Sequence, residues 1–499
     1  MKIFKININK IWINKINMKY LKIKEYKNLV FFSSFFLFCF CFCSPKAMAI
    51  SITQEKKLAK KFMKAIKEQK TIIKDPISTN FIKNIGAKIV AHIEPQPFDF
   101  SFNIVDDNNF NAFAGPGANI FINTGVITSV DNVNELAGII SHEIGHSTCR
   151  HVSQMIDRSK KVQIGTIAGV LAGVLLGSKG NKGSENIAQG MIISSMAAGQ
   201  TTMLSFSREN EEEADQKGLS YVTAASFSPK GLLTALKKMR SIDWYGTDNV
   251  PGYLKTHPHL KDRIIYIETW LADNYMKSNS SNNINPMKIN LAKIDSIKFN
   301  MVKYRLQGLY KKKDTAQKKF AELLKKNPDN PGAHYGMALV LERKSMFKQA
   351  LFHLEQAILL KPFNPFILFE ISKIHIHLGN TKKALNILEK LDNIPEISLQ
   401  ISYYKALAKL ELGMFDKAKK DFLKIIKKSS SSFPKAYYYI AKILKNNGKN
   451  GLSHYYLGLY YYEIKNIKNG CFHFKKSLKL LNDLEKIKKV NKLLKKCKK

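Results

Sequence analysis

The stretch Ser141-His142-Glu143-Ile144-Gly145-His146 places two histidines four residues apart, with a glutamate directly after the first of them. Residues four apart lie on the same face of a helix, so the imidazoles of His142 and His146 can bind one metal ion. Glu143 is angled beside this face and stays free to take a proton from a water molecule at the metal. The apolar spacing around the motif fits a helix with Asp131 as its N-cap. The stretch therefore predicts a metal-dependent hydrolase site inside a helix.

A zinc site with two histidines from one helix needs a third protein ligand. The segment from Ser207 to Asp215 contains five carboxylates, a composition that ordinarily indicates a solvated helix face. Glu211 and Asp215 lie four residues apart and would share one face, which makes Glu211 the best candidate for the third ligand. Asp215 could then accept the outer N–H of a ligating histidine and hold its tautomer.

Other reactive residues near the motif receive structural interpretations. His151 follows His146 by five residues, a spacing that rotates it away from the metal face of a continuing helix. Three of the six cysteines lie before residue 44. The others, Cys149, Cys471 and Cys497, are odd in number and have no paired spacing, so we expect no disulfide framework.

Residues 1–49 have the order of parts of a secretory signal. Nine lysines and one glutamate give them a net charge of +8, the apolar run 29–43 follows, and Ala47-Met48-Ala49 supplies small residues suited to cleavage after Ala49. The apolar run is short for a bilayer span, although an uncleaved anchor is the alternative. Met18 is an alternative to Met1 as the start, because the basic region is long for a signal.

The formal net charge of +41 does not by itself indicate nucleic-acid binding. Lysines are spread through almost every segment and no nucleic-acid motif accompanies them, so we expect a solvated, lysine-rich surface and no nucleic-acid partner. A length of 499 residues with 45% hydrophobic content is sufficient for two or three domains with cores of their own.

Before the motif, the residue pattern predicts helices over 50–93, a strand over 98–104, a turn over 111–117 and a second strand over 119–124. The second strand is either an edge to which an extended substrate peptide adds or an ordinary strand paired on both sides. After the motif, the glycine-rich apolar segment 162–202 has three interpretations: a close-packed pair of core helices, a mobile lid, or a membrane-touching hairpin.

Beyond a polar linker the chain repeats with a period of 34 residues. Four alanines fall in register, namely Ala316, Ala350, Ala384 and Ala418. Small residues stand twelve positions before three of them, namely Ala338, Ser372 and Ala406. Such a pattern is typical of stacked helix pairs that cross closely. A change of phase before Gly458 and Gly470 predicts an inserted helix around 434–447, and the lysine-rich 486–499 reads as a capping helix or a frayed tail.

Four ordered stretches resemble the HtpX-like and CAAX-protease-like zinc metallopeptidases. They are NAFAGPGANIFINTG (111–125), HEIGH (142–146), SRENEEEAD (207–215) and THPHLKDR (256–263). The resemblance implies one zinc ion per chain, with His142, His146 and Glu211 as its ligands and Glu143 as the catalytic base. It also implies that His257 and Arg263 lie near the metal and can stabilise the oxyanion, and that His257 can cap the zinc in a resting, self-inhibited state.

With a signal sequence and repeats, the chain is most similar to periplasmic members of this family. We therefore expect a signal peptide over 1–49, an α+β, mainly helical zinc metallopeptidase domain of gluzincin-like fold over 50–277, and a linker over 278–297. An all-α tetratricopeptide-repeat solenoid is expected over 298–482, and a basic tail over 483–499.

The leading functional hypothesis is a periplasmic zinc endopeptidase that acts on misfolded or stalled outer-membrane proteins. In this hypothesis Glu143 carries a proton from water to the leaving amine, and His257 or Arg263 holds the oxyanion. The repeats would bind client polypeptides or the outer-membrane assembly machinery, and 162–202 offers a peripheral membrane contact. The alternative is a chaperone or assembly adaptor whose protease site is mostly self-inhibited.

Overall fold

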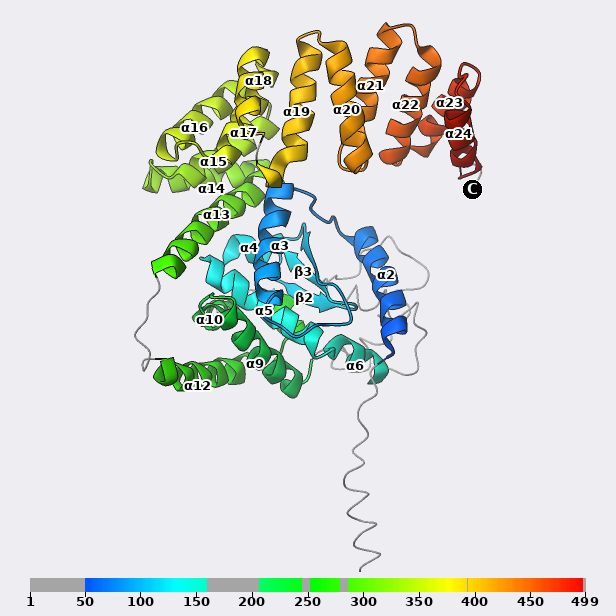
Figure 1. Cartoon of the computed structure of the whole chain (residues 1–499). Helices are drawn as coiled ribbons and strands as arrows, with labels where there is room; N and C mark the ends of the chain where they lie inside the picture. The colour runs from blue at the N-terminus through cyan, green and yellow to red at the C-terminus, as the bar shows by residue number, and fades with distance from the viewer. Residues whose placement is uncertain (1–49, 159–205, 245–251, 279–285, 393, 497–499) are drawn as a thin grey trace, which may run out of the picture.

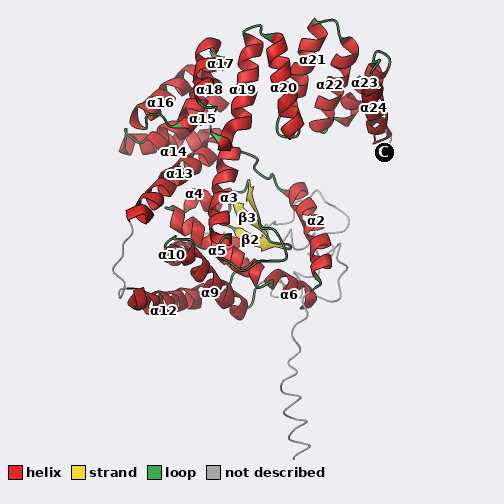
Figure 2. Cartoon of the chain, viewed as in Figure 1, coloured by secondary structure: helices red, strands yellow, loops and turns green. Residues whose placement is uncertain are grey.

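The computed structural model describes residues 50–158, 206–244, 252–278, 286–392 and 394–496 (Figure 1). The expected signal peptide and the segment 162–202, with its three interpretations, lie outside these residues. A small sheet sits among helices in the first domain, and the second domain consists of helices that form an arc above it (Figure 2). Among the helices described, none is both long enough and apolar enough to cross a membrane.

The sheet corrects two predictions about the strands. It contains β1 (Ser101–Val105), β2 (Ala112–Gly115) and β3 (Asn119–Asn123) in the order β1-β3-β2. β3 pairs in parallel with β1 and antiparallel with β2, so of the two alternatives for residues 119–124 the ordinary strand paired on both sides is confirmed and the peptide-binding edge is wrong. The turn predicted over 111–117 is mostly strand β2, because Phe113 is buried and stacks on Phe121 of β3 at a centroid distance of 4.9 Å. The edge strands of this sheet are β1 and β2.

Helices surround the sheet and bury the metal-binding motif. In chain order they are α2 (Ile52–Gln69), α3 (Pro76–Val90), α4 (Thr124–Ser129), α5 (Val133–Thr148), α6 (His151–Arg158), α9 (Arg208–Ala224), α10 (Lys230–Trp244), α11 (Gly252–Thr256) and α12 (Leu260–Ser278). The motif lies in α5, which is buried along most of its length. Its N-cap is Asn132 instead of the predicted Asp131, because the Asn132 side chain accepts hydrogen bonds from the backbone N–H groups of Asn134 and Glu135.

The repeats form a solenoid of successive helices, as the 34-residue period predicts. They are α13 (Pro286–Tyr310), α14 (Lys313–Lys326), α15 (Pro331–Arg343), α16 (Phe347–Leu360), α17 (Pro365–His377), α18 (Thr381–Lys390), a 3-10 turn (Pro395–Ile397), α19 (Ser398–Glu411), α20 (Phe415–Ser429), α21 (Pro434–Asn446), α22 (Asn450–Glu463), α23 (Ile467–Leu478) and α24 (Leu484–Lys496). The four alanines in register are all buried. The fold class is therefore confirmed: a mainly helical α+β domain precedes an all-α solenoid.

The ends of the repeat region differ in detail from the expected boundaries. α13 begins at Pro286, inside the expected linker, and α24 occupies most of the expected tail, with Val490 fully buried. A helix, α21, lies where the phase change predicts an insertion.

Cys471 is disulfide-bonded, so the expectation of no disulfide is wrong for this residue. Cys149 is a free cysteine.

A buried cluster of charged residues joins the two domains. Arg305 on α13 donates through Nε and Nη2 to Asp75, the N-cap of α3, at 2.7–3.0 Å. Its Nη1 lies 2.7 Å from Glu370 of α17 and 2.6 Å from the Tyr335 hydroxyl. Burial raises the pKa of Asp75, but the charge of Arg305 and the hydrogen bonds from Arg305 and Ser78 together outweigh burial and hold this pKa below its usual value. The joint is therefore held by interactions between residues far apart in the chain.

Replacement of Arg305 should destabilise this joint. In Arg305→Met the carboxylate of Asp75 stays buried without its cation, and Glu370 keeps only its pairing with Lys373. Loss of one partner of a buried ion pair typically costs about 3–5 kcal/mol of unfolding free energy. Urea denaturation of the full chain at neutral pH measures the loss. Because the pKa of Asp75 is depressed in the folded state, its contribution is complete above the unfolded-state value of about 3.9 and is lost as the pH falls through the folded-state value. The deficit of the variant should therefore shrink on acidification.

A matched control is Lys344→Met, which removes a cation whose partner Asp314 is almost fully exposed. Exposed ion pairs contribute at most about 1 kcal/mol. Equal destabilisation by the two changes would contradict the role assigned to Arg305.

Candidate metal centre

The centre is built where helices α5 and α9 cross closely. α5 presents His142, Glu143 and His146, and α9 presents Glu211 and Asp215. At the crossing, a Cβ placed on Gly145 would lie only 2.6 Å from the backbone oxygen of Ala214. The glycine inside the motif therefore allows the two helices to approach, and this approach brings the carboxylate of Glu211 beside the two imidazoles.

Four fully buried side chains bring donor atoms together. His142 Nε2 lies 3.0 Å from His146 Nε2, and Glu211 Oε1 lies 3.3 Å from His146 Nε2. His257, just after α11, places Nδ1 2.9 Å from Glu211 Oε1 and 3.4 Å from His142 Nε2. All the donor atoms of this set lie within 4.8 Å of one another. Ligands of a tetrahedral zinc ion, at bond lengths of 2.0–2.1 Å, are separated by roughly 3.3 Å, so this donor set fits zinc.

Glu143 lies beside these donors without joining them. Neither of its carboxylate oxygens has a hydrogen-bond partner among the described residues, and Oε1 is 3.6 Å from His257 Nε2. Burial raises the pKa of Glu143, even though the nearby His257 and His142 act in the opposite direction. A buried carboxylate in this position has the environment of a general base that works on a water molecule at the centre.

Arg263 of α12 holds the carboxylates of α9. Its Nε and Nη2 each donate to Asp215 at 2.8 Å, and its Nη1 lies 2.6 Å from Glu211 Oε2. Asp215 in turn lies 2.7 Å from the outer ring nitrogen, Nδ1, of His142. Burial raises the pKa of Asp215, but the charges of Arg263 and His142 and their hydrogen bonds together outweigh burial and lower it. All the guanidinium nitrogens thus face groups of the centre, and Asp215 occupies the position expected for a residue that orients His142.

His257 is held between the acidic groups of the centre. Burial lowers the pKa of His257, but the charges of Glu211 and Glu143 and the hydrogen bond with Glu211 together outweigh burial and raise it. The ring also stacks on Tyr253 of α11, at a centroid distance of 4.2 Å and an interplanar angle of 24°. The structure thus brings together all seven residues that the sequence nominates, since His142, His146, Glu211, Glu143, Asp215, His257 and Arg263 occupy one buried cluster.

Several neighbours of the centre were not predicted from the sequence. Phe206 stacks on His146 at 3.9 Å, and Tyr253 is fully buried with a hydroxyl that has no hydrogen-bond partner in the described parts of the chain. His151, expected to face away, places Nδ1 2.8 Å from Nδ1 of His146. His151 thus lies off the metal face, but its contact with His146 was not expected. The contact forms because α5 does not continue: Arg150 adopts a left-handed φ of 55° and the chain turns back at His151. The presence of a third histidine shortly after the motif was the feature of the sequence that could have indicated this contact.

Glu213 and Cys149 lie near His151. His151 Nε2 is 3.1 Å from Glu213 Oε2, and donor atoms of Cys149, His151 and Glu213 lie within 4.8 Å of one another. Burial and the Glu213 carboxylate raise the pKa of the Cys149 thiol to about 12, so the thiol is protonated at neutral pH. A protonated thiol is a poor metal ligand.

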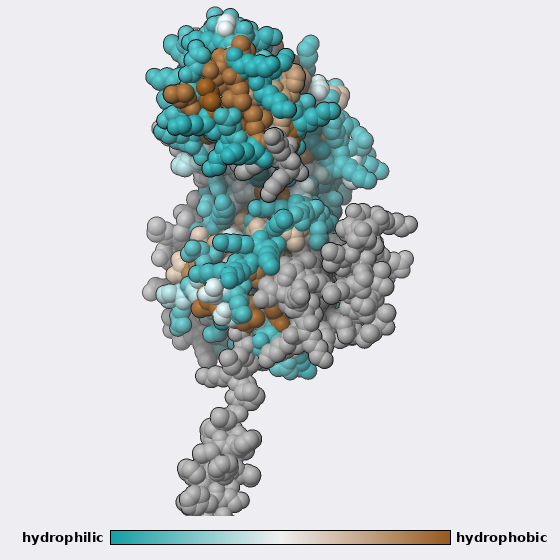
Figure 3. Space-filling model, turned by 90° about the vertical axis from the view of Figure 1, so that its right-hand side faces the viewer, coloured by the Kyte–Doolittle hydropathy of each residue, from teal (hydrophilic) through white to brown (hydrophobic). Residues whose placement is uncertain are grey.

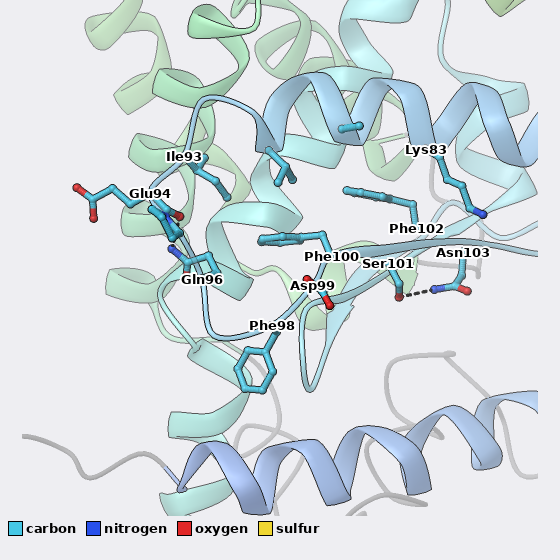
Figure 4. A pocket seen from close by; sticks show the side chains of 13 residues that line it. Lys83, Ile93, Glu94, Gln96, Phe98, Asp99, Phe100, Ser101, Phe102 and Asn103 are labelled. Atoms are coloured by element: carbon cyan, nitrogen blue, oxygen red, sulfur yellow. Dashed lines mark hydrogen bonds between the residues drawn. The ribbon is translucent and has the colours of Figure 1, made fainter.

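A separate pocket lies at the far edge of the sheet, between α3 and β1 (Figure 4). Its lining includes Lys83 of α3 and the aromatic side chains of Phe98, Phe100 and Phe102. None of the residues of the metal centre lines it.

Comparisons with known proteins agree with this arrangement. The model of peptidase family M48 matches residues 76–271, and a tetratricopeptide-repeat model matches residues 401–432. The beta-barrel assembly-enhancing protease of Escherichia coli (strain K12) is 26% identical over 343 residues, which are 68% of this chain and 66% of that protein. The protein of the same name from Yersinia pestis is 25% identical over 71% of this chain and 70% of its own length.

A more distant relative is the mitochondrial metalloendopeptidase OMA1 of Schizosaccharomyces pombe. It is 26% identical over 204 residues, which are 41% of this chain and 56% of that protein. The chain therefore carries a peptidase family M48 domain, which is a metallopeptidase domain, followed by tetratricopeptide repeats.

Proposed function

We propose that the protein is a zinc endopeptidase of the periplasm that cleaves misfolded or stalled outer-membrane proteins. The observation that carries the proposal is the buried set His142, His146 and Glu211, with the unpaired carboxylate of Glu143 beside it. A zinc ion held there would polarise the scissile carbonyl and make water more acidic. Glu143 would accept the proton of the attacking water and pass it to the leaving amine. The relatives named for beta-barrel assembly support the choice of client.

We infer that the site rests in a closed state. A tetrahedral metal has four positions, and a catalytic site keeps one of them open. With His257 Nδ1 beside the other three donors, four protein groups are available to fill the shell and none is left for water or substrate. Arg263 is committed to Asp215 and Glu211, so its surroundings favour a role in holding these carboxylates over a role at the oxyanion. Movement of His257 would open the site and free its ring to stabilise the oxyanion.

The substrate backbone is proposed to lie along β2 instead of β3. Among the described strands β2 pairs with β3 alone, so its outer edge has backbone groups available to an extended peptide. The chain just before β2 also adjoins the helix that precedes His257, since Phe110 accepts a hydrogen bond from the backbone N–H of Tyr253 at 3.3 Å. A peptide on this edge would therefore pass close to the group that closes the site.

The repeats are proposed to bind client polypeptides or partners in outer-membrane assembly. Apolar side chains gather on the end of the repeat array, within a hydrophilic surround (Figure 3). Exposed large apolar residues of the last helices include Phe472, Leu480 and Leu484. Exposed apolar groups of this kind suit contact with unfolded or partly assembled protein. The closed metal centre also supports the second candidate function, a chaperone or assembly adaptor that cleaves only when the site is opened.

Replacement of the proposed base should abolish cleavage while zinc is kept. In Glu143→Gln, kcat on an unfolded polypeptide such as casein should fall by roughly 10²–10⁴-fold. Zinc content, measured by mass spectrometry of the metal, should stay at one per chain, because Glu143 is not a ligand. Glu68→Gln, on the exposed end of α2, is the control. Undiminished cleavage by Glu143→Gln, or full rescue of an outer-membrane assembly defect by it, would favour the adaptor.

Removal of the closing group should activate the enzyme. If the open form is populated at about 1–10%, His257→Ala should raise kcat/KM roughly tenfold or more. The control is His259→Asn, two residues away and exposed, because asparagine tolerates the left-handed backbone of this position (φ 63°). A large loss of activity in His257→Ala with zinc still bound would show instead that His257 acts mainly at the oxyanion.

Loss of the third ligand should remove the metal. Glu211→Ala leaves only His142, His146 and His257 to hold zinc. Loss of a residue that merely hydrogen-bonds a metal ligand lowers metal affinity by about 10- to 100-fold. Loss of a ligand itself should lower zinc affinity, measured in competition with a chelator, by at least as much. Glu212→Ala changes the adjacent, exposed carboxylate of the same helix and should retain zinc. Retention of stoichiometric zinc by Glu211→Ala would refute the ligand assignment.

A further inference from the structure

The two histidines of α5 differ in what holds their outer ring nitrogens. A histidine that binds a metal through one nitrogen is fixed in tautomer and orientation by a hydrogen bond at the other. For His142 that partner is the carboxylate of Asp215, 2.7 Å from Nδ1. For His146, Nδ1 faces no carboxylate and lies instead 2.8 Å from Nδ1 of His151. The far nitrogen of His151, Nε2, lies 3.1 Å from Oε2 of Glu213.

In the series of contacts from Glu213 through His151 to His146, only one placement of the hydrogens is possible. A carboxylate only accepts, so Nε2 of His151 must carry a hydrogen and donate it to Glu213. In a neutral imidazole the other nitrogen is then bare, and Nδ1 of His151 accepts. The short contact with His146 therefore requires the hydrogen on Nδ1 of His146. This leaves the lone pair of Nε2, the atom beside His142 and Glu211, free to bind the metal.

We propose that Glu213 and His151 are positioning residues that form a hydrogen-bond relay and fix His146 in its metal-binding tautomer. This inference rests on the proposed metal site. Each ligating histidine is then backed by a carboxylate of α9, His142 directly through Asp215 and His146 through the interposed ring of His151.

The fold places His151 for this role. The left-handed Arg150 reverses the chain between α5 and α6, and its guanidinium is held by Glu55 of α2, with Nη2 2.7 Å from Oε2. The reversal returns the ring of His151 to the outer side of His146, where it is almost fully buried. Glu213 is about half exposed, so its substitution is tolerated better than that of a core residue.

Charge reversal at Glu213 gives the sharpest test. In Glu213→Gln the amide oxygen still accepts from His151, so zinc affinity should stay close to that of the wild type. In Glu213→Ala the relay has no fixed direction, and affinity in a chelator competition should fall by about 10- to 100-fold. In Glu213→Lys the ammonium donates to His151 Nε2, which moves the hydrogen of His151 to Nδ1 and forces His146 into the Nε2–H tautomer, so affinity should fall further.

Glu212→Lys is the matched control, because it makes the same change of charge one residue away without contact with His151. Ring ¹⁵N spectra of histidine-labelled, metal-free full chain report the tautomer directly, and His146→Asn identifies its signal. The expected result is Nδ1–H for His146 in the wild type and Nε2–H in Glu213→Lys. The relay would be overturned if Glu213→Lys and Glu212→Lys had equal zinc affinities, or if the His146 tautomer were unchanged in Glu213→Lys. It would also be overturned if the wild type bound two zinc ions per chain and Cys149→Ala lost one of them. None of these measurements needs peptidase activity, so they test the relay even if the proposed peptidase function is wrong.

Discussion

The close crossing of helices α5 and α9 is the constraint on which the metal centre depends. Glycine stands on both sides of the contact: Gly145 faces the backbone of Ala214, and a Cβ on Gly218 would lie 3.1 Å from Cα of His142. Ser141 adds a bond across the crossing, since its hydroxyl donates to the backbone oxygen of Gly218 at 3.0 Å. Metal sites tolerate only about 0.2 Å in their bond lengths. Larger side chains here would separate the helices by more than that, and Glu211 would no longer reach the histidines.

The same crossing places several charged groups in the interior, and their mutual arrangement offsets the cost of burial. Glu143, Glu211 and Asp215 are all fully buried, and Arg263 and His257 supply positive charge among them. Burial of a charge is costly unless it is paired and hydrogen-bonded. Arg263 donates hydrogen bonds to Asp215 and forms an ion pair with Glu211, whereas Glu143 has neither a hydrogen bond nor an ion pair with Arg263 in the described structure. Glu143, the unpaired carboxylate, is the one proposed to transfer a proton. Glu211 and Asp215, which Arg263 contacts, are those proposed to bind the metal or to orient its ligand.

Features encoded by local spacing could be predicted from the sequence. The pair His142 and His146, the carboxylates Glu211 and Asp215, and the 34-residue period each follow from the geometry of a single helix or repeat. Features that depend on contacts between distant segments could not be predicted. The pairing of β3 on both sides, the ion pair of Arg305 with Asp75, and the return of His151 toward His146 depend on such contacts. The contact of His151 with His146 also requires a left-handed backbone at Arg150, and an arginine does not predict that conformation.

We propose that three imidazoles and one carboxylate close the metal shell of the resting protein. X-ray absorption at the zinc edge of the purified full chain tests it most directly, because scattering from the outer atoms of imidazole rings counts the histidine ligands. We expect three histidines, namely His142, His146 and His257, and one carboxylate, with bond lengths near 2.0–2.1 Å. A resting shell with two imidazoles and a coordinated water would contradict it.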